Sequence, residues 1–459
     1  MAKKRQQISR RDFLRMAGVA GTAVSTKSLM PFLAAQAPPQ ETSSKSIHPW
    51  WVRVVDQPTI GIDWDRLQRF DARDTVRGAG FIKYIGEEHA RLLKEIGDQN
   101  EKQRILDNVP GYTLKDYALR SAQSSDTRSS LKFLGPKHAP TPESRGVPKW
   151  AGSPAESARI LRTAMRHFGA ATVGFLELNE NTRKLIYSYD PDGRELVFDH
   201  VDEASETIEK RVIPFKARWA IVYTVQMSQE TLKRAPTVTA SQTTDLAYNR
   251  GAHIQARTQE FLRGLGYQGL GEATTNGLGI APALAVMAGL GELSRLNRLI
   301  TPEYGPMVRI FKMITDLPLA TDKPIDAGIM EFCRQCKKCA EACPPAALSL
   351  ADEPSWQIKG GWNNPGHQAY FEDSVKCKTY MEEHAGTNCG ICFAVCPFAK
   401  KNKAWIHDWV KASISQLPVG DQFFRTMDDA FSYGAKKDPE LWWELDQPEY
   451  GIDTERSNE

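Results

Sequence analysis

The sequence predicts a mixed α/β (α+β) fold in which a core of strands and helices is followed by a small cysteine-rich module. Two observations support this prediction. Between residues 151 and 320, short apolar segments typical of strands alternate with segments of helical periodicity. All eight cysteines of the 459-residue chain lie between Cys333 and Cys396. A chain of this length is expected to form about three domains.

The predicted elements of the core follow the chain in order. A helix capped by Ser153 or Ser157 should run to His167, because apolar residues recur there at helical spacing. Ahead of the core, residues 87–105 also have a helical pattern. Strands are expected at residues 170–178, 184–189, 195–198, 219–227 and 308–315, and helices at 228–234, 243–265 and 281–290.

The cysteines form two runs with the spacing of metal ligands. The first run, beginning at Cys333, reads C-x2-C-x2-C-x3-C-P, and the second begins at Cys377, eleven residues before C-x2-C-x3-C-P. In bacterial ferredoxins the fourth cysteine of such a run binds the other cluster. The spacing therefore predicts a ferredoxin-like module with two 4Fe-4S clusters. The first cluster is assigned to Cys333, Cys336, Cys339 and Cys396, and the second to Cys377, Cys389, Cys392 and Cys343.

Two zinc sites are the alternative interpretation of these cysteines. Zinc sites usually need only paired C-x2-C halves, so they leave the doubled four-cysteine runs and their trailing prolines, Pro344 and Pro397, unexplained. The pattern therefore favours iron and sulfur.

The N-terminus has the three regions of an export signal. A basic start contains Arg10 and Arg11, a weakly apolar segment covers residues 16–24, and residues 35–37 form a small-x-small cleavage site. The paired arginines are typical of the twin-arginine route. A basic amphipathic helix of the mature protein is the alternative, but the order of the three regions disfavours it. We therefore expect a signal peptide at residues 1–37 and a mature protein on the outer face of the cytoplasmic membrane.

The export route and the cysteines are compatible. Thiols outside the cytoplasm are usually oxidised to disulfides, whereas the twin-arginine route carries folded proteins that already hold their cofactors. No later stretch has about 18 consecutive apolar residues, so attachment to the membrane would require a small hydrophobic anchor protein. The net charge of +3 comes from interspersed basic and acidic residues, and nothing in it indicates a nucleic-acid partner.

Other motifs have simpler explanations. Gly264 to Gly269 matches G-x-G-x-x-G, but a dinucleotide site needs a strand before the motif, and here a helix precedes it. We therefore expect Gly264 to end that helix as a C-cap. His407 could bind a metal, yet a lone histidine beside an aspartate is more often structural. Trp442 and Trp443 are expected to be packing anchors, because exposed paired tryptophans are unfavourable.

Taken together, the signal, the core and the cysteine runs resemble the corrinoid-dependent respiratory reductive dehalogenases over nearly the whole chain. The resemblance is carried most specifically by AGLGE at 288–292 with SR at 294–295, LIT at 299–301, YGP at 304–306 with VR at 308–309, DKP at 322–324, EFC at 331–333, and Trp405 with His407 and Asp408.

This resemblance implies a nitroreductase-like core that binds a cobalamin-type corrinoid. The family has no protein ligand below the cobalt, and this chain lacks the D-x-H-x-x-G motif of a histidine-ligated corrinoid. The implied activity is the removal of halide from an organohalide with two electrons and one proton, as the terminal step of organohalide respiration. The implied partners are an organohalide substrate, an upstream electron donor and the membrane anchor.

The resemblance also assigns roles to residues of the core. Tyr248 matches the proton donor, Arg309 matches a basic residue that supports it, and Asn276 lies beside them. Thr244 and Tyr370 match positions in the wall of the substrate pocket. The physical chemistry suits these roles, because a tyrosine with an ordinary pKa of about 10 is protonated at neutral pH and a nearby arginine favours its phenolate.

Two other functions are compatible with parts of the sequence. Epoxyqueuosine reductase has a related corrinoid core and cluster module, but it acts on tRNA in the cytoplasm, whereas this chain has Arg10 and Arg11 and lacks a basic patch. An electron-transfer protein with two clusters and no corrinoid would leave the long core without a purpose. The expected segments are a signal peptide (1–37), a linker and N-terminal unit (38–150), the corrinoid-binding core (151–320), the cluster module (321–404) and a helical, aromatic tail (405–459).

Overall fold

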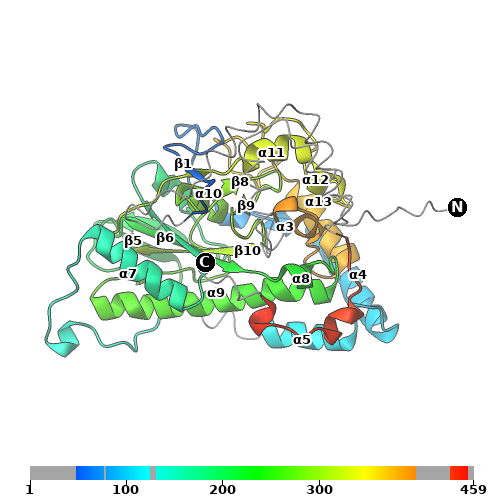
Figure 1. Cartoon of the computed structure of the whole chain (residues 1–459), viewed down its shortest axis with the longest axis horizontal. Coiled ribbons are helices and arrows are strands. Elements are labelled where there is room, and N and C mark those ends of the chain that lie inside the picture. The colour runs from blue at the N-terminus through cyan, green and yellow to red at the C-terminus, as the bar shows by residue number, and fades with distance from the viewer. Residues whose placement is uncertain (1–47, 77–78, 125–130, 400–434, 453–459) are drawn as a thin grey trace, which may run out of the picture.

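A four-stranded antiparallel sheet with the order β2-β6-β10-β7 forms the centre of the protein (Figure 1). The structure is a computed structural model that describes residues 48–76, 79–124, 131–399 and 435–452. The two central strands, β6 and β10, pair along their whole length, from Trp219 opposite Thr315 to Gln226 opposite Val308. The strands of this sheet are β2 (Thr172–Glu177), β6 (Trp219–Gln226), β10 (Val308–Thr315) and β7 (Gly269–Leu270).

Each face of the central sheet has its own hydrophobic core, because side chains of a strand point alternately to the two faces. On β10, Phe311 belongs to the core shared with α7 (Pro154–His167) and α9 (Val238–Leu265). Ile314 belongs to the opposite core, which includes α10 (Ala281–Met287). In Figure 1, α7 and α9 lie below the sheet and α10 lies above it. The sheet is therefore enclosed between two helical layers.

Local capping explains where the two helices of the lower layer begin. The Ser153 side chain accepts a hydrogen bond from the Glu156 amide at 3.3 Å, and Pro154 occupies the first helical turn, where its missing N–H costs nothing. Thr237 caps α9 in the same way by accepting from the Ala240 amide at 3.1 Å. The helix predicted to start at residue 243 therefore starts at Val238.

Two predictions about local structure are wrong. The α9 C-cap is Gly266, with φ of 91°, and Gly264 lies inside the helix. The strand predicted at residues 184–189 is absent, because this part of the described chain first forms the 3-10 helix η3 (Thr182–Leu185). The Thr182 hydroxyl donates to the Glu177 carbonyl at 2.6 Å, which turns the chain back at the end of β2.

Smaller sheets and helices surround the central layers. The remaining strands are β1 (Arg53–Val54) paired with β11 (Ile325–Asp326), β3 (Glu195–Asp199) parallel to β5 (Lys210–Pro214), β4 (Ser205–Glu206) antiparallel to β5, and β8 (Glu292–Leu293) paired with β9 (Leu299–Ile300). The remaining α-helices are α3 (Ala79–Ile85), α4 (Glu87–Leu106), α5 (Leu114–Ser124), α8 (Gln229–Leu232), α11 (Ile329–Cys336), α12 (Lys338–Glu341), α13 (Ser374–Tyr380) and α14 (Ile391–Ala394). Short 3-10 helices are η1 (Ala72–Asp74), η2 (Glu143–Arg145), η5 (Pro397–Ala399), η7 (Glu440–Glu444) and η8 (Glu449–Gly451), and η4 (Met381–Ala385) is π-helical.

The segment at residues 435–452 packs back onto the lower side of the protein. Trp442 donates its indole N–H to the Thr231 hydroxyl at 3.0 Å, and Trp443 donates to the Asp116 carboxylate at 3.1 Å. These contacts fit the prediction of a packing anchor for the partly buried Trp442, whereas Trp443 is 38% exposed, so the prediction that exposure of the pair would be avoided is wrong for Trp443. The predicted signal peptide and His407 lie outside the described residues.

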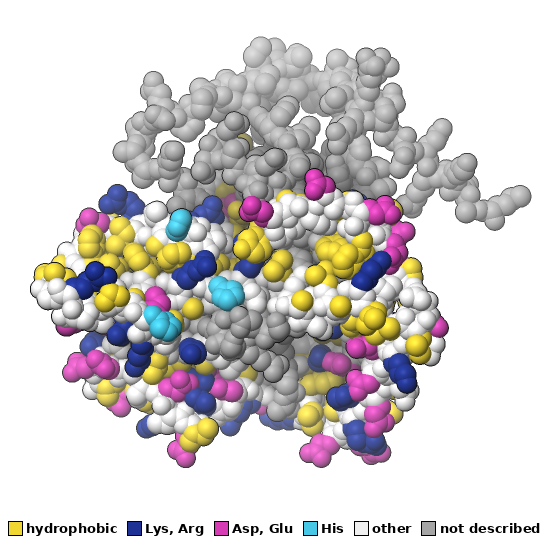
Figure 2. Space-filling view, turned by 90° about the horizontal axis from the view of Figure 1, so that it is seen from below, with side chains coloured by type: hydrophobic (Ala, Val, Ile, Leu, Met, Phe, Trp, Pro, Cys, Tyr) yellow, Lys and Arg dark blue, Asp and Glu magenta, His cyan; other side chains and the backbone are white. Residues whose placement is uncertain are grey.

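Basic and acidic side chains are mixed on the face shown in Figure 2, in keeping with the small net charge of +3. Within the described ranges, every helix is too short or too polar to cross a membrane.

The contact between α9 and β10 gives a test of the packing. A Cβ added to Gly251 would lie 1.9 Å from Cζ of Phe311. Gly251→Ala should therefore lower the free energy of unfolding by roughly 1–3 kcal/mol, the usual cost of overpacking. Gly264→Ala is the matched control on the same helix, since its added Cβ meets no atom within 4 Å and should stabilise the helix by up to about 1 kcal/mol. Equal thermal midpoints for the two variants would contradict this packing.

Candidate active site and cluster-binding module

The phenol of Tyr248 is held between α9 and the loop that follows β7. Its hydroxyl donates to Oδ1 of Asn276 at 3.1 Å. Its ring packs edge-on against Phe311, with ring centres 5.9 Å apart. Asn276 has a left-handed backbone, with φ of 62°. The phenol oxygen is therefore fixed by a side chain that depends on an unusual loop conformation.

Arg309 of β10 lies beside Tyr248. Its Nη2 donates to Oγ1 of Thr244 at 3.0 Å, and its Cζ lies 5.5 Å from the centre of the Tyr248 ring. The same guanidinium lies 5.5 Å from the ring of Phe393, which stands next to Cys392 in the sequence. Cation–π contacts of this kind favour a charged arginine. The structure thus brings Tyr248, Asn276, Arg309 and Thr244 together and places them against the cluster-binding segment.

One carboxylate adds to the electrostatics of this group. Burial raises the pKa of Asp245, while the Arg120 and Arg309 guanidiniums oppose that shift. The Arg120 Nε lies 3.6 Å from Oδ2 of Asp245. The positive charge of Arg309 is therefore set in a partly buried cluster of opposite charges.

The structure places Tyr370 elsewhere. Its hydroxyl donates to the Asp352 carbonyl at 2.6 Å, and the Arg295 guanidinium lies 3.9 Å from the centre of its ring. Burial raises the pKa of Tyr370 to about 12. These contacts join Tyr370 to the cluster-binding module, and its role as a wall of the substrate pocket stays a prediction.

The last cysteine of each run lies near thiols of the other run. Burial raises the pKa of Cys396 well above its ordinary value, and the nearby thiols of Cys333, Cys339 and Cys336 raise it further. Burial likewise raises the pKa of Cys389, to which the thiol of Cys343 adds. The last cysteine of each run therefore acts on thiols of the other run, and the thiol of Cys339 also raises the pKa of Cys392. This exchange supports the ligand assignment made from the spacing, which stays a prediction.

The two sets differ in depth. Cys333, Cys336, Cys339 and Cys396 are buried, whereas Cys343, Cys377, Cys389 and Cys392 are partly exposed. Across the described residues, no three Cys, His, Asp or Glu side chains converge on a single metal ion. The cysteines of a 4Fe-4S cluster bind different irons, so their thiols are spread around the cluster. Iron binding would also remove the thiol protons that burial retains.

A buried carboxylate of β8 caps the helix that carries the first two cysteines. Oε1 of Glu292 accepts hydrogen bonds from the amides of Ala327 and Ile329 at 2.7 and 3.1 Å. Oε2 accepts from the Met330 amide at 3.3 Å and from the Thr59 hydroxyl at 2.6 Å. Free amides at a helix N-terminus favour a negative charge. Glu292 therefore fixes the start of α11 on the core.

Arg295 holds the other end of the same helix. Its Nε donates to the Cys333 carbonyl at 2.8 Å, and its Nη1 donates to the carbonyls of Ser349 and Ala351, each at 2.7 Å. Its Nη2 donates to the Arg334 carbonyl at 3.1 Å. This side chain is 1% exposed. The segment from Glu292 to Arg295 thus forms hydrogen bonds with both ends of α11.

A cavity of about 180 Å³ lies where the N-terminal unit, α10 and residues 362–371 meet. It is mostly apolar, and three asparagines are among its lining residues. Burial lowers the pKa of His367 in its wall to about 4, so this imidazole is neutral at pH 7. The lining includes Ile60, Ile62, Trp64, Tyr187, Ile280, Met287, Phe371, Asn297, Asn363 and Asn364.

Three residues near the Tyr248 group were missed by sequence reasoning. Phe393 was missed because it lies within the second cysteine run, where the spacing draws attention only to the cysteines. Lys312 and Glu272 form an ion pair in which each side chain is 1% exposed. A lysine inside the otherwise apolar strand at 308–315 was the available signal, because a buried lysine needs a partner.

Buried and half-buried cysteine sets beside a tyrosine–arginine site define an oxidoreductase that combines electron transfer with proton transfer. A family model described as "Reductive dehalogenase subunit" matches residues 47–319, and one described as "4Fe-4S double cluster binding domain" matches residues 332–399. The chain therefore belongs to the reductive dehalogenase family. The predicted fold class and the prediction of two 4Fe-4S clusters are confirmed by these matches.

Individual proteins are similar over nearly the whole chain. The trichloroethene reductive dehalogenase of Dehalococcoides mccartyi is 28% identical over 97% of this chain and 98% of its own length. The tetrachloroethene reductive dehalogenase of Sulfurospirillum multivorans is 30% identical over 99% of this chain and 96% of its own length.

A solved reductive dehalogenase structure, reported with a mechanism for B12-dependent dehalogenation, superposes with a TM-score of 0.63 at 25% identity. The match covers 83% of this chain and 49% of that chain, so this protein spans about half the length of the solved structure. The epoxyqueuosine reductase of Bacillus subtilis matches only 27% of this chain, at 30% identity, and that alternative is not favoured.

The exchange of cysteines between the two runs predicts a pattern of cluster loss. Cys392 and Cys396 lie four residues apart in the sequence, but Cys396→Ala and Cys392→Ala should each remove a different cluster and about half of the iron. Combining Cys377→Ala with Cys392→Ala should then cost no more iron than either change alone. Combining Cys377→Ala with Cys396→Ala should remove both clusters. Iron analysis and electron paramagnetic resonance of the reduced variants measure this, and the reverse pattern would disprove the assignment.

Proposed function

We propose that this protein replaces the halogen of an organohalide by hydrogen, R–X + 2 e⁻ + H⁺ → R–H + X⁻, as the terminal step of organohalide respiration. The observation that carries the proposal is the Tyr248 hydroxyl, bound to Asn276 and flanked by Arg309, directly beside the cluster-binding segment. Small chloroethenes are the first substrates to test, because the full-length relatives are named for them.

A corrinoid of the cobalamin type is the cofactor that this activity requires. When bound, it supplies a low-valent cobalt that can pass two electrons to an organohalide. The cavity beside α10 suits part of such a group, since its apolar walls fit the face of a macrocycle and its asparagines can pair with amide substituents. Ile280 in the cavity wall lies four residues after Asn276. The loop that carries Asn276, which binds the Tyr248 hydroxyl, therefore continues into the wall of this cavity.

The protein residues supply and control the proton. Loss of halide leaves a carbon that must gain a proton, and a positioned acid provides it when water is largely excluded. Tyr248 is that acid in our proposal, with Arg309 stabilising the phenolate left behind. Thr244 holds the guanidinium of Arg309, and Asn276 holds the phenol oxygen until the proton is transferred.

The two cysteine sets suggest the direction of electron flow. The set of Cys343, Cys377, Cys389 and Cys392 is the more exposed one, so its cluster would receive electrons from an upstream donor. The buried set, attached to the core through Arg295, would pass them on. Electron transfer thus proceeds from the surface towards the core.

We also propose that the mature protein works on the outer face of the cytoplasmic membrane. Arg10 and Arg11 support export by the twin-arginine route. A small hydrophobic partner protein would hold the enzyme at the membrane, as the family resemblance implies.

Tyr248→Phe tests the proton donor. The change keeps the ring and its packing against Phe311 but removes the acidic hydroxyl, so clusters and corrinoid should stay bound. Turnover per bound corrinoid should fall by about 10²-fold or more, the usual scale for a general acid. Arg309→Leu should impair the same step, so the double variant should lose far less than the product of the two single losses. A fully loaded Tyr248→Phe enzyme with wild-type turnover would rule out this donor.

Replacing Arg10 and Arg11 by lysine tests the location. Export should stop, because the paired arginines are what the route recognises, and the protein should accumulate in the cytoplasm with its signal uncleaved. Cell fractionation and the mass of the N-terminus measure this. Lys3 and Lys4 changed to arginine are the control, since they lie outside the paired motif. Unchanged export of the lysine variant would refute the proposed route.

A further inference from the structure

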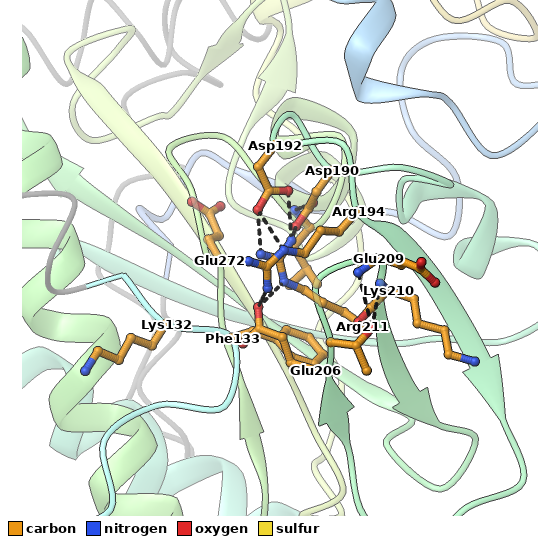
Figure 3. A network of polar contacts seen from close by, with 12 residues as sticks. Lys132, Phe133, Asp190, Asp192, Arg194, Glu206, Glu209, Lys210, Arg211 and Glu272 are labelled. Carbon is orange, nitrogen blue, oxygen red and sulfur yellow. Dashed lines mark hydrogen bonds and ion pairs between the residues drawn. The ribbon is translucent and has the colours of Figure 1, made fainter.

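Four charged side chains are buried behind the loop that carries Asn276. Lys312 is 0% exposed, and Glu272, Asp190 and Arg211 are each 1% exposed. Figure 3 shows Arg211 among the carboxylates of Asp190 and its neighbours, with Glu272 nearby. Buried ion pairs contribute little net stability, because desolvation offsets their attraction. Stability of the fold therefore does not explain why these four charges are buried behind the loop.

One end of the loop is fixed at Glu272. Its carboxylate forms an ion pair with the Lys312 ammonium. Its backbone N–H donates to Oε1 of Gln255, and its carbonyl accepts from Nε2 of Gln255, both at 2.9 Å. Lys312 lies on β10 and Gln255 on α9. Glu272 is therefore tied to the same strand that carries Arg309 and the same helix that carries Tyr248.

The other end of the loop is fixed at Leu278. Its amide donates to Oδ1 of Asp190 at 2.7 Å, and its carbonyl accepts from the Tyr187 amide at 3.0 Å. Arg211 holds Oδ2 of Asp190 at 2.5 Å. Arg211 is itself held by Asp192 and Glu206 at 2.6 and 2.7 Å.

The two ends are also linked through space. Burial raises the pKa of Glu272 to about 7, the Lys312 ammonium opposes that shift, and the negative charge of Asp190 adds to it. Lys312 likewise acts against the raised pKa of Asp190. The charges at the two ends of the loop therefore form one electrostatic group.

The backbone between these anchors is strained. Asn276 and Leu278 both adopt left-handed conformations, with φ of 62° and 66°. This region costs an L-residue roughly 1–2 kcal/mol, and such conformations persist only where the surroundings over-determine them. With Glu272 and Leu278 fixed, the short segment between them has little freedom, and the Asn276 side chain is directed at the Tyr248 hydroxyl.

We propose that Glu272, Lys312 and Asp190 are positioning residues that hold the Asn276 amide against the Tyr248 hydroxyl and so align the proton donor. This inference rests on the proposed function of Tyr248. It assigns the buried charges to the chemistry of the site rather than to the stability of the fold.

The test compares Glu272→Gln, Lys312→Met and the double variant, all loaded with clusters and corrinoid. Each single change leaves one buried charge without its partner, so both should lower the thermal midpoint, whereas the double variant removes both charges and should recover most of it. Turnover per corrinoid should stay about 10- to 100-fold low in all three, the scale for a small misplacement of a catalytic group. A double variant with wild-type turnover would overturn the proposal.

Two readouts separate positioning from general damage. Hydrogen exchange measured by mass spectrometry should become faster in peptides covering 271–279. In the Tyr248→Phe background, Glu272→Gln should cause no further loss of turnover. The same loss in both backgrounds, or unchanged exchange in the loop, would overturn the proposal. If Tyr248→Phe alone kept full turnover, the proposed role of Tyr248 as the proton donor would be wrong. That outcome can be told apart from a failure of the positioning proposal.

Asp322→Asn is the matched control. Asp322 pairs with Arg162 at 2.8 Å and accepts from the Phe175 amide at 2.8 Å. Phe175 lies on β2, the edge strand opposite β7 in the central sheet. This variant should lower the thermal midpoint while leaving loop exchange and turnover per corrinoid unchanged. A comparable loss of turnover in Asp322→Asn would show that any damaged ion pair of this core has the same effect, and would overturn the proposal.

Discussion

The hydrogen bonds that Glu292 and Arg295 form with helix α11 are the interaction that joins the α/β core to the cluster-binding module. A carboxylate that accepts four hydrogen bonds and a guanidinium that donates four replace the water that these groups lose on burial. Both side chains come from one short stretch of the core. The buried cysteine set is thereby fixed relative to the sheet, and the distance over which electrons must travel is fixed with it.

The central sheet fixes the residues around Tyr248 in a similar way. Strand β10 lies between β6 and β7, so its backbone is held on both sides, and it presents Arg309 to α9. Helix α9 in turn carries Thr244 and Tyr248 on one face, four residues apart. Tyr248 and Arg309 therefore come from two rigid elements, while Asn276 comes from a loop that is anchored separately.

The sequence was most informative where a local rule decides the structure. The α7 helix follows from Ser153 and Pro154, and β10 from its apolar run, because capping and strand patterning act over a few residues. The start of α9 was missed because its first turns contain buried threonine, serine and glutamine side chains in place of an apolar stripe. The strand predicted at residues 184–189 is wrong because the chain turns at Thr182. Thr182 lies ahead of these residues, so their own apolar pattern gives no sign of the turn.

The residues of the candidate site also differ in whether neighbouring or distant parts of the sequence determine their arrangement. Cysteine spacing is local, and it predicted the two 4Fe-4S clusters that the family model confirms, while the division of the eight cysteines between them stays a prediction. The convergence of Tyr248, Asn276 and Arg309 came from the family resemblance, since nothing in their spacing brings them together. The ion pair of Lys312 and Glu272 joins residues forty positions apart, one on β10 and one just after β7, and only the pairing of these two strands brings them together.

The alternation of β10 has one more consequence. Arg309 and Lys312 are three positions apart, so they stand on opposite faces of the sheet, one towards α9 and the other towards Glu272. A slip of one residue would turn every side chain to the wrong face. It would bury two cations among apolar groups at once, in addition to exposing apolar residues to polar partners. These two charges thus also favour the correct register of strand pairing, and insertions or deletions in this strand should be among the least tolerated changes in the protein.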